Sequence, residues 1–431
     1  MTPPQEKTSW KHWVEPWYLS YALLGVSAAG LAPILLPLAI SATGNIAQVG
    51  LVVALFNLGG LIAPVWGGIA DRSRSYRAIL IGGLLATTAG FALFPLTLSL
   101  PVRLLLALAQ GGGAAAAATV GNMLIVEAHP REEWDKRIGW LQTFYGVGQV
   151  GGLLLAGLIG QVDMRGSLIA AAALTALAVV PAWSITKPPA GRILPRPLLT
   201  HPARHAELSA GSPQQFHHHL GSSSLRNILR PLVSPFGGFL IAWLLSFAGA
   251  AAFFSLYPVI MQEAFGIQPS LSSPAFAVAA ALGLLLYPPA GSWSGRVGPM
   301  RVLQAGFAIR LLAFGGLFLL GSVQAGSRVV PALLGFLLIV LAWSFLSVAG
   351  TAVSARAAHM GEGEALGLYN AVTAVAGVIG AALAGWLASQ WGYTAVPAMG
   401  IIGIALGMII VFILGKTMKT REEANQKPST V

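Results

Sequence analysis

Apolar runs about as long as a lipid bilayer is thick recur along almost the whole chain. A helix needs about 20 apolar residues to cross the hydrocarbon core. Twelve runs meet this length, at about 17–41, 47–70, 78–98, 102–126, 138–160, 166–186, 236–262, 272–292, 302–322, 329–353, 366–389 and 394–415. The runs are too long for barrel strands and lack the alternation of polar and apolar residues that such strands show. Only 9% of the residues are charged, against about 25% in soluble domains, so we predict an all-α polytopic membrane protein.

The distribution of basic residues predicts the orientation of the chain. With the N-terminus inside, 21 of the 25 Lys and Arg residues fall in inside segments and 3 fall in outside loops. Lys and Arg are retained on the cytoplasmic side, so both termini are predicted to be cytoplasmic and the protein is placed in the inner membrane of the cell. The basic residues are spread over seven segments, so the net charge of +11 indicates contact with anionic lipid and not with nucleic acid. We expect a monomer.

The longest stretch without a span divides the chain into two groups of six spans. Its composition cannot bury enough apolar surface to fold by itself. The predicted organisation is a cytoplasmic N-terminus at 1–16, a six-helix bundle at 17–186, a cytoplasmic linker at 187–235, a second six-helix bundle at 236–415 and a cytoplasmic tail at 416–431.

The two bundles resemble each other in sequence. The fifth span (138–158) aligns with the eleventh (366–386) at a constant offset of 228. The alignment matches three pairs of glycines: Gly139 with Gly367, Gly152 with Gly380, and Gly157 with Gly385. Because each half contains six spans, the repeat is parallel and its axis lies along the membrane normal.

A charged motif, GGIADRSRSYR at 67–77, separates the second span from the third. The segment GSWSGRVGPMR at 291–301 follows the eighth span in the same way. The Gly-x-x-x-Asp-Arg loop, its weaker second copy and the six-plus-six arrangement resemble the major facilitator superfamily over residues 15–415. Two positions depart from the family pattern: Arg74 stands where the family has Gly, and Gly295 replaces the Asp in the second copy.

The resemblance implies a conformational latch between the two halves at the cytoplasmic face. Asp71 is expected at the start of the eleventh helix, where N–H groups favour a negative charge, and Arg72 is expected to pair with Glu127. The latch residues are Gly67, Asp71, Arg72, Glu127 and Arg296. The alternative is that the arginines of the motif only enforce the topology.

The resemblance also places spans 1, 4, 7 and 10 around a central path, spans 2, 5, 8 and 11 beside it, and spans 3, 6, 9 and 12 against lipid. Polar groups inside a membrane usually face protein or water. We therefore predict that polar residues of the spans around and beside the central path contact substrate. They are Asn57, Gln110, Gln142, Tyr145, Gln149, Ser246, Tyr257, Trp343, Ser347, Asn370 and Thr373. For each residue the alternative is a hydrogen bond between helices. Arg310, within the ninth span, is predicted to snorkel to the inner interface.

Acidic residues are absent from the middle of every predicted span, although Glu127 and Glu263 stand at span ends. RLLLALAQGGGAAAA (103–117) resembles the fourth-helix motif of drug–proton antiporters, with Ala107 in place of its Arg. We therefore expect a secondary active transporter that works by alternating access. Proton-coupled export of drug-like or amphipathic compounds is the leading hypothesis, and uptake or facilitated transport of a neutral metabolite such as a sugar is the alternative. No cofactor other than the coupling ion, H+, is expected.

Other protein classes fit the residues less well. An intramembrane enzyme needs a nucleophile with a base, or paired metal ligands, and the chain has no Cys, HExxH or GxSxG pattern, so no enzyme is predicted. Five histidines gather in the middle loop at positions 201, 205, 217, 218 and 219, but they lack Cys or acidic co-ligands, so no metal site is predicted. A non-transporting receptor on the same fold is a further alternative.

Overall fold

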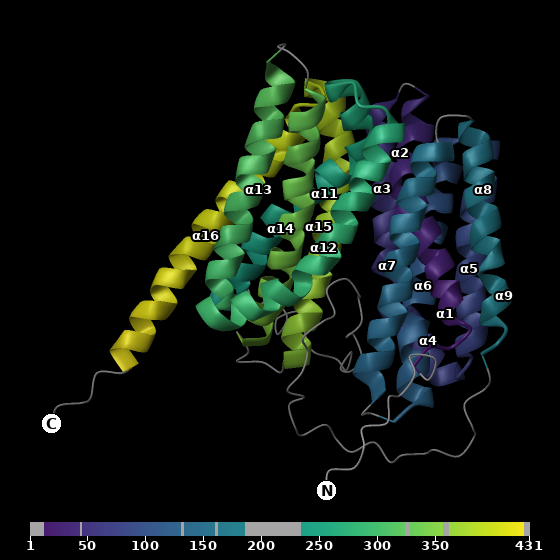
Figure 1. Ribbon diagram of the computed structural model, residues 1–431, viewed down its shortest axis with the longest axis horizontal. Helices are drawn as coiled ribbons and strands as arrows, with labels where there is room; N and C mark the ends of the chain where they lie inside the picture. The colour runs from purple at the N-terminus through teal and green to yellow at the C-terminus, as the bar shows by residue number, and fades with distance from the viewer. Residues whose placement is uncertain are drawn as a thin grey trace, which may run out of the picture.

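Long helices standing side by side form the described part of the chain (Figure 1). The computed structural model describes residues 13–43, 45–130, 133–159, 163–185, 234–323, 328–356 and 362–425. Among these residues, twelve helical segments are long and apolar enough to cross a membrane, and no strand occurs. The predicted class, an all-α polytopic membrane protein, is confirmed. Nearly all of the predicted linker at 187–235 lies outside the described residues.

The N-terminal half contains the first six spans. Its elements are α1 (Tyr18–Leu24), the π-helical η2 (Gly25–Leu31), α2 (Ala32–Ser41), α3 (Ile46–Gly60), α4 (Ala63–Ser73), α5 (Tyr76–Leu93), the short 3-10 helix η3 (Phe94–Leu96), α6 (Leu100–Ala128), α7 (Trp134–Ile159), α8 (Met164–Leu177) and α9 (Val179–Ala182). The first span consists of α1, η2 and α2, and the second of α3 and α4.

The C-terminal half contains one long helix for each of the remaining spans. They are α11 (Pro235–Phe265), α12 (Pro269–Val297), α13 (Pro299–Ser322), α14 (Val329–Arg356), α15 (Glu362–Trp391) and α16 (Ala395–Asn425). The last helix continues past residue 415, where the predicted span ends, because the following Lys, Met and Glu residues are good helix formers once outside the hydrocarbon.

The paired glycines of the two halves make equivalent contacts within each half. A Cβ on Gly152 of α7 would overlap the carbonyl oxygen of Val26 in η2, and a Cβ on Gly380 of α15 would overlap that of Ala248 in α11. Span 5 therefore packs on span 1 as span 11 packs on span 7. Such close backbone approach is typical of small residues between membrane helices.

The next pair of glycines makes equivalent contacts between the halves. A Cβ on Gly157 of α7 would lie 2.8 Å from Pro274 Cδ of α12, and a Cβ on Gly385 of α15 would lie 2.9 Å from the Gly50 nitrogen of α3. The two halves thus meet along α7 against α12 and along α3 against α15. These glycines, which match between the two halves in sequence, therefore occupy equivalent helix contacts in the structure.

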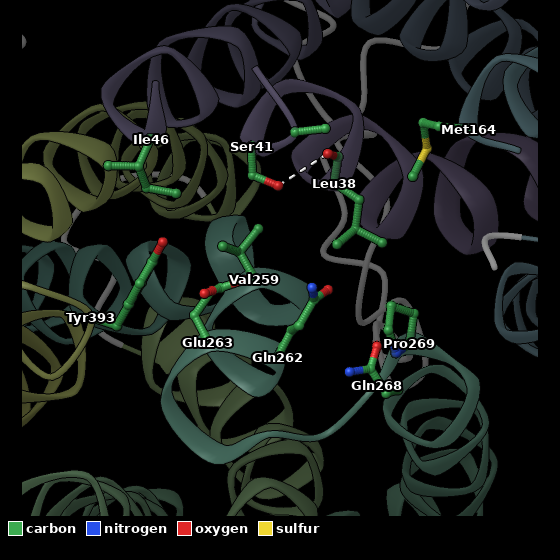
Figure 2. Close-up of a pocket in the computed structure, with 11 residues that line it drawn as sticks. Leu38, Ser41, Ile46, Met164, Val259, Gln262, Glu263, Gln268, Pro269 and Tyr393 are labelled. Carbon is green, nitrogen blue, oxygen red and sulfur yellow. Dashed lines mark hydrogen bonds between the residues drawn. The ribbon is translucent and has the colours of Figure 1, made fainter. Parts of the chain in front are cut away.

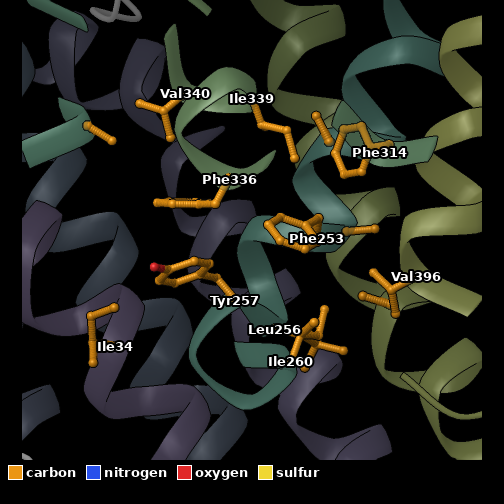
Figure 3. Close-up of a cluster of buried hydrophobic side chains, with 14 of the residues drawn as sticks. Ile34, Phe253, Leu256, Tyr257, Ile260, Phe314, Phe336, Ile339, Val340 and Val396 are labelled. Carbon is orange, nitrogen blue, oxygen red and sulfur yellow. The ribbon is translucent and has the colours of Figure 1, made fainter. Parts of the chain in front are cut away.

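A large aromatic core fills the C-terminal half. Tyr257 of α11 stacks on Phe336 of α14 with ring centroids 4.1 Å apart, and Phe253 meets Phe314 of α13 edge-on at 5.5 Å. Figure 3 shows these rings together with Ile34 of α2, so the core extends into the N-terminal half. Burial of these rings holds α11, α13 and α14 together.

The contacts between the halves lie mainly toward one end of the bundle. We call the end where α1 begins and α16 ends the terminal end, and the opposite end the distal end. The distal part of the first span, α2, packs on α11, whereas the principal neighbours of α1 and α4, at the terminal end, all belong to the N-terminal half. The halves are therefore joined at the distal end.

Candidate functional site

Aromatic side chains from four helices meet on the inner side of the C-terminal half. The ring centroids of Trp243 and Tyr369 lie 4.9 Å apart, those of Phe247 and Trp343 lie 5.4 Å apart, and those of Trp243 and Trp343 lie 6.2 Å apart. Tyr287 of α12 completes the group through a hydrogen bond with Trp343. We call these five residues the aromatic wall. Aromatic pairs at such spacings attract one another beyond their buried area.

Hydroxyl groups tie the aromatic wall to its helices. The indole N–H of Trp243 donates to Thr373 Oγ1 at 2.8 Å, and the Thr373 hydroxyl donates to the Tyr369 carbonyl at 2.8 Å. Tyr287 also hydrogen-bonds with Ser347. The expected substrate contacts Trp343, Ser347 and Thr373 are thus brought together. The structure adds Trp243, Tyr287 and Tyr369, which the sequence analysis missed because aromatic residues in an apolar span carry no polar signal.

Arg310 of α13 also belongs to this region, contrary to the predicted snorkelling. It is 2% exposed, its guanidinium carbon lies 5.5 Å from the centroid of the Trp343 ring, and its Nε donates to the Ile339 carbonyl at 3.4 Å. The side chain turns toward α14 because the cation–π contact with Trp343 and the carbonyl compensate part of the cost of leaving water. The ninth span therefore contributes to the interior, not only to the lipid face.

The polar face of α7 lies beside α12, across the junction of the halves. Gln142, Tyr145 and Gln149 are half-buried, and a Cβ on the neighbouring Gly146 would lie 3.4 Å from Leu284 of α12. The counterpart of Gln142 in the C-terminal half, Asn370, is half-buried as well. Tyr145 packs against the buried cluster of the N-terminal half that includes Tyr18 and Tyr21.

Asn57 connects the two halves directly. Its side-chain amide donates to the Gly377 carbonyl of α15 at 3.3 Å. At this residue the structure shows the alternative considered from the sequence, a hydrogen bond between helices.

Three other expected substrate contacts lie away from the aromatic wall. Gln110 is fully buried against Gly90 of α5, and its amide atoms have no hydrogen-bond partner among the described residues. Ser246 donates to its own helix and faces Gly407 of α16, and Tyr257 lies in the aromatic core, where it donates to the Ser272 carbonyl at 2.7 Å. Packing between neighbouring helices accounts for the positions of all three.

Two of the expected latch residues, Arg72 and Glu127, are not joined in this conformation. Arg72 and Glu127 are both exposed, and no ion pair connects them in the part of the chain that the structure describes. Gly67 is buried and Arg296 is exposed, whereas the side chain of Asp71 lies outside those described.

A charge network that the sequence analysis missed lies near the terminal end of the N-terminal half. Glu15 is 2.6 Å from His129 Nε2 and 3.4 Å from Arg137 Nη1, and Arg137 Nε donates to Glu133 at 2.8 Å. These contacts fasten the segment before α1 to the connection between α6 and α7. No sequence signal revealed them, because Glu15 and His129 are 114 positions apart.

A cavity of about 600 Å³ opens at the distal end, between the halves. In Figure 2 the side chains of Glu263 and Gln262 point from α11 toward Ser41 and Leu38 of α2. Burial, with a smaller contribution from nearby Glu263, raises the pKa of Tyr393, so this phenol stays protonated and can donate a hydrogen bond. Glu263 is the carboxylate among the described residues that line this cavity.

Comparison with known proteins agrees with the geometry. A family model described as Major Facilitator Superfamily matches residues 17–362. The chain belongs to the major facilitator superfamily. Membership in this superfamily, together with the twelve spans, indicates a multi-pass membrane transporter.

Solved structures of other major facilitator superfamily transporters share the fold. The nucleoside transporter NupG aligns with a TM-score of 0.70 and 14% identity over 94% of this chain and 97% of that one. The D-xylose-proton symporter aligns with a TM-score of 0.64 and 15% identity over 91% of this chain and 95% of that one. A bacterial homologue of the human lysosomal transporter Spinster, in an inward-facing and occupied conformation, aligns with a TM-score of 0.67 and 14% identity over 93% of this chain and 96% of that one. At these identities the likeness concerns the fold alone.

A curated relative shows local sequence similarity. The tetracycline resistance protein, class C, of Escherichia coli is 30% identical over 131 residues. The matched part is 30% of this chain and about a third of that protein, 32%.

Proposed function

We propose that this protein is a secondary active transporter that exports drug-like, amphipathic compounds in exchange for protons. The aromatic wall is the observation that carries the proposal. Half-buried rings such as Trp343 and Tyr287 suit the flat, apolar body of an amphipathic molecule, and the hydroxyl of Tyr287 suits its polar substituents. The local similarity to a tetracycline resistance protein supports export.

We propose alternating access as the transport mechanism. The positive-inside distribution supports a cytoplasmic terminal end, and we accordingly place the protein in the inner membrane. The halves meet at the distal end, so this conformation corresponds to an inward-facing state. Rocking about the glycine contacts of α3 with α15 and α7 with α12 would close the terminal end and separate the distal end. The site lies within a single chain, which supports a monomer as the working unit.

Glu263 is the proposed proton-binding group. It lies in the distal cavity between the halves, faces α2 and has the protonated phenol of Tyr393 nearby. A carboxylate whose surroundings change as the halves separate can take up a proton in one state and release it in the other. H+ is accordingly the proposed coupling ion.

Uptake of a neutral metabolite is a second candidate, and one observation favours it. The amide and hydroxyl face of Gln142, Tyr145 and Gln149 can hydrogen-bond a polyhydroxylated solute. The nucleoside and xylose transporters share the fold, although they are similar in fold alone. A non-transporting receptor would have the same structure and show no flux.

Flux measurements in proteoliposomes test the proposal. Nile red, a neutral fluorescent dye, should cross the membrane at a rate that rises with an imposed pH gradient. Trp343→Ala should slow this flux by about tenfold, because a large hydrophobic ring contact is lost, whereas Trp391→Ala, an exposed tryptophan at the end of α15, should not. Flux of xylose or a nucleoside without dye flux would favour the second candidate. Absence of any flux would favour the receptor.

A further inference from the structure

Arg310 is a buried cation whose surroundings carry only partial negative charge. Within the described residues, its hydrogen bond is the one to the Ile339 carbonyl at 3.4 Å. The Trp343 ring covers one face of the guanidinium, and the Tyr369 hydroxyl is close enough to interact with it electrostatically. No ion pair of Arg310 occurs in the described part of the chain.

A buried charge without a counter-charge is costly, so buried arginines are usually paired. Arg103 has a similar set of neighbours: it is 6% exposed, donates to the Thr97 carbonyl at 2.9 Å and lies 5.4 Å from the Phe94 ring. Arg103 is in the first turn of α6, where an arginine can reach the membrane interface. Arg310, in the middle of α13, has no such explanation. An ionisable residue at this depth indicates a functional site.

We propose that Arg310 supplies the counter-charge for an anionic group on the transported solute. This inference rests on the proposed function and narrows the substrate class to amphipathic organic anions, such as aromatic carboxylates. The guanidinium lies directly behind the half-buried Trp343. On the wall itself, Tyr287 provides a hydroxyl next to the same ring.

Different groups of this region then recognise different parts of the solute. The rings of the aromatic wall hold the aromatic body of the solute, and the hydroxyl of Tyr287 donates to the carboxylate. Arg310, behind the Trp343 ring, stabilises the negative charge of the carboxylate. This stabilisation needs no direct contact, because electrostatic interactions extend further where water is excluded.

Thermal stability of the purified full-length protein tests the inference with two probes of equal size. 1-Naphthoate carries a carboxylate, and 1-naphthamide is its neutral analogue. In micelles free of anionic lipid, naphthoate should stabilise the wild-type protein at lower concentration than naphthamide. Arg310→Met should weaken the apparent affinity for naphthoate by about tenfold or more and change that for naphthamide by no more than about twofold.

The ligand-free melting temperature provides a second readout. Because Arg310→Met removes an uncompensated buried charge, the ligand-free variant should melt at or above the wild-type temperature. Arg103→Met is the matched control, and it should leave the preference for naphthoate unchanged. Arg310→Lys keeps the charge and should retain part of the preference, which allows a test even if the methionine variant folds poorly.

Two outcomes would overturn the inference. If Arg310→Met lowers the melting temperature and weakens the apparent affinity for both probes equally, Arg310 is a packing residue. If naphthoate fails to stabilise the wild-type protein, the solute is not an organic anion of this kind. Flux of the neutral dye Nile red would still be measured separately, so the proposed transport function would survive that second result.

Discussion

At the scale of single residues, Arg74 shows the physical reason for a departure from the family pattern. It caps the end of α4 in the left-handed region, with φ of 50°, and its N–H bonds the Ala70 carbonyl at 2.8 Å. Glycine adopts this conformation without steric cost, whereas other residues pay about 1–2 kcal/mol. The glycine of the family pattern is therefore the residue that this helix end favours.

We predict that Arg74→Gly stabilises the protein. The gain should be about 1 kcal/mol, because relief of the left-handed strain outweighs the greater freedom of glycine in the unfolded chain. Thermal unfolding of the purified variant measures the effect. A lower melting temperature would mean that the arginine side chain makes a compensating contact.

Gly350 makes room for the aromatic wall. A Cβ at this position would lie 2.7 Å from the Tyr369 hydroxyl and 3.2 Å from the Trp243 ring. Gly350→Ala should displace these side chains and weaken binding of an amphipathic ligand by about tenfold, the effect of moderate overpacking. Tryptophan fluorescence during ligand titration measures this loss. Gly315→Ala on α13, where a Cβ meets nothing within 4 Å, is the control, and an equal loss there would contradict the assignment of the wall.

At the scale of helices, the contact between α3 and α15 determines how tightly the distal end closes. A Cβ on Gly50 would overlap the Ala381 carbonyl oxygen and lie 2.7 Å from the Gly385 nitrogen. These neighbours are backbone atoms, so they cannot rotate away. The two helices, and with them the two halves, would have to separate.

We predict that Gly50→Ala shifts the protein toward states open at the distal end. A penalty of about 1.4 kcal/mol, within the usual range for overpacking, changes the equilibrium tenfold. A single Ser41→Cys in the distal cavity should then react faster with a thiol reagent added from that side. Gly60→Ala lies in the same helix with open space around it and should not change the rate. Unchanged reactivity with Gly50→Ala would show that the contact does not control closure.

At the scale of the whole molecule, the charge distribution predicts one orientation. Since the chain contains no cysteine, single cysteines report it directly. Both Ser73, the last residue of α4, and Gln268, before α12, are exposed. A membrane-impermeant maleimide added to intact cells should label Gln268→Cys and not Ser73→Cys. The reverse pattern would place the termini outside and the aromatic wall open to the outer face.

The sequence by itself determined the number of spans, the division into two halves and the paired glycines. These features depend on local composition, because hydrocarbon admits only helices whose backbone bonds are satisfied internally. Two of the three glycine pairs, Gly152 with Gly380 and Gly157 with Gly385, are explained by close packing, which excludes any side chain, so both copies of the repeat keep the same residue. Gly139 has open space around it. Trp343, Ser347 and Thr373 were predicted to contact substrate, and the structure places them in one region.

Only the tertiary structure decided which side of each helix faces the interior. Lipid is as apolar as the protein core, so a span such as α13 shows no amphipathic stripe that would have placed Arg310 inside. A hydroxyl can also bond the carbonyl one turn back in its own helix, as Ser246 does with Ala242, so a polar residue within a span does not by itself indicate a cavity. Contacts between distant segments, such as Glu15 with His129, exist only after the spans have packed.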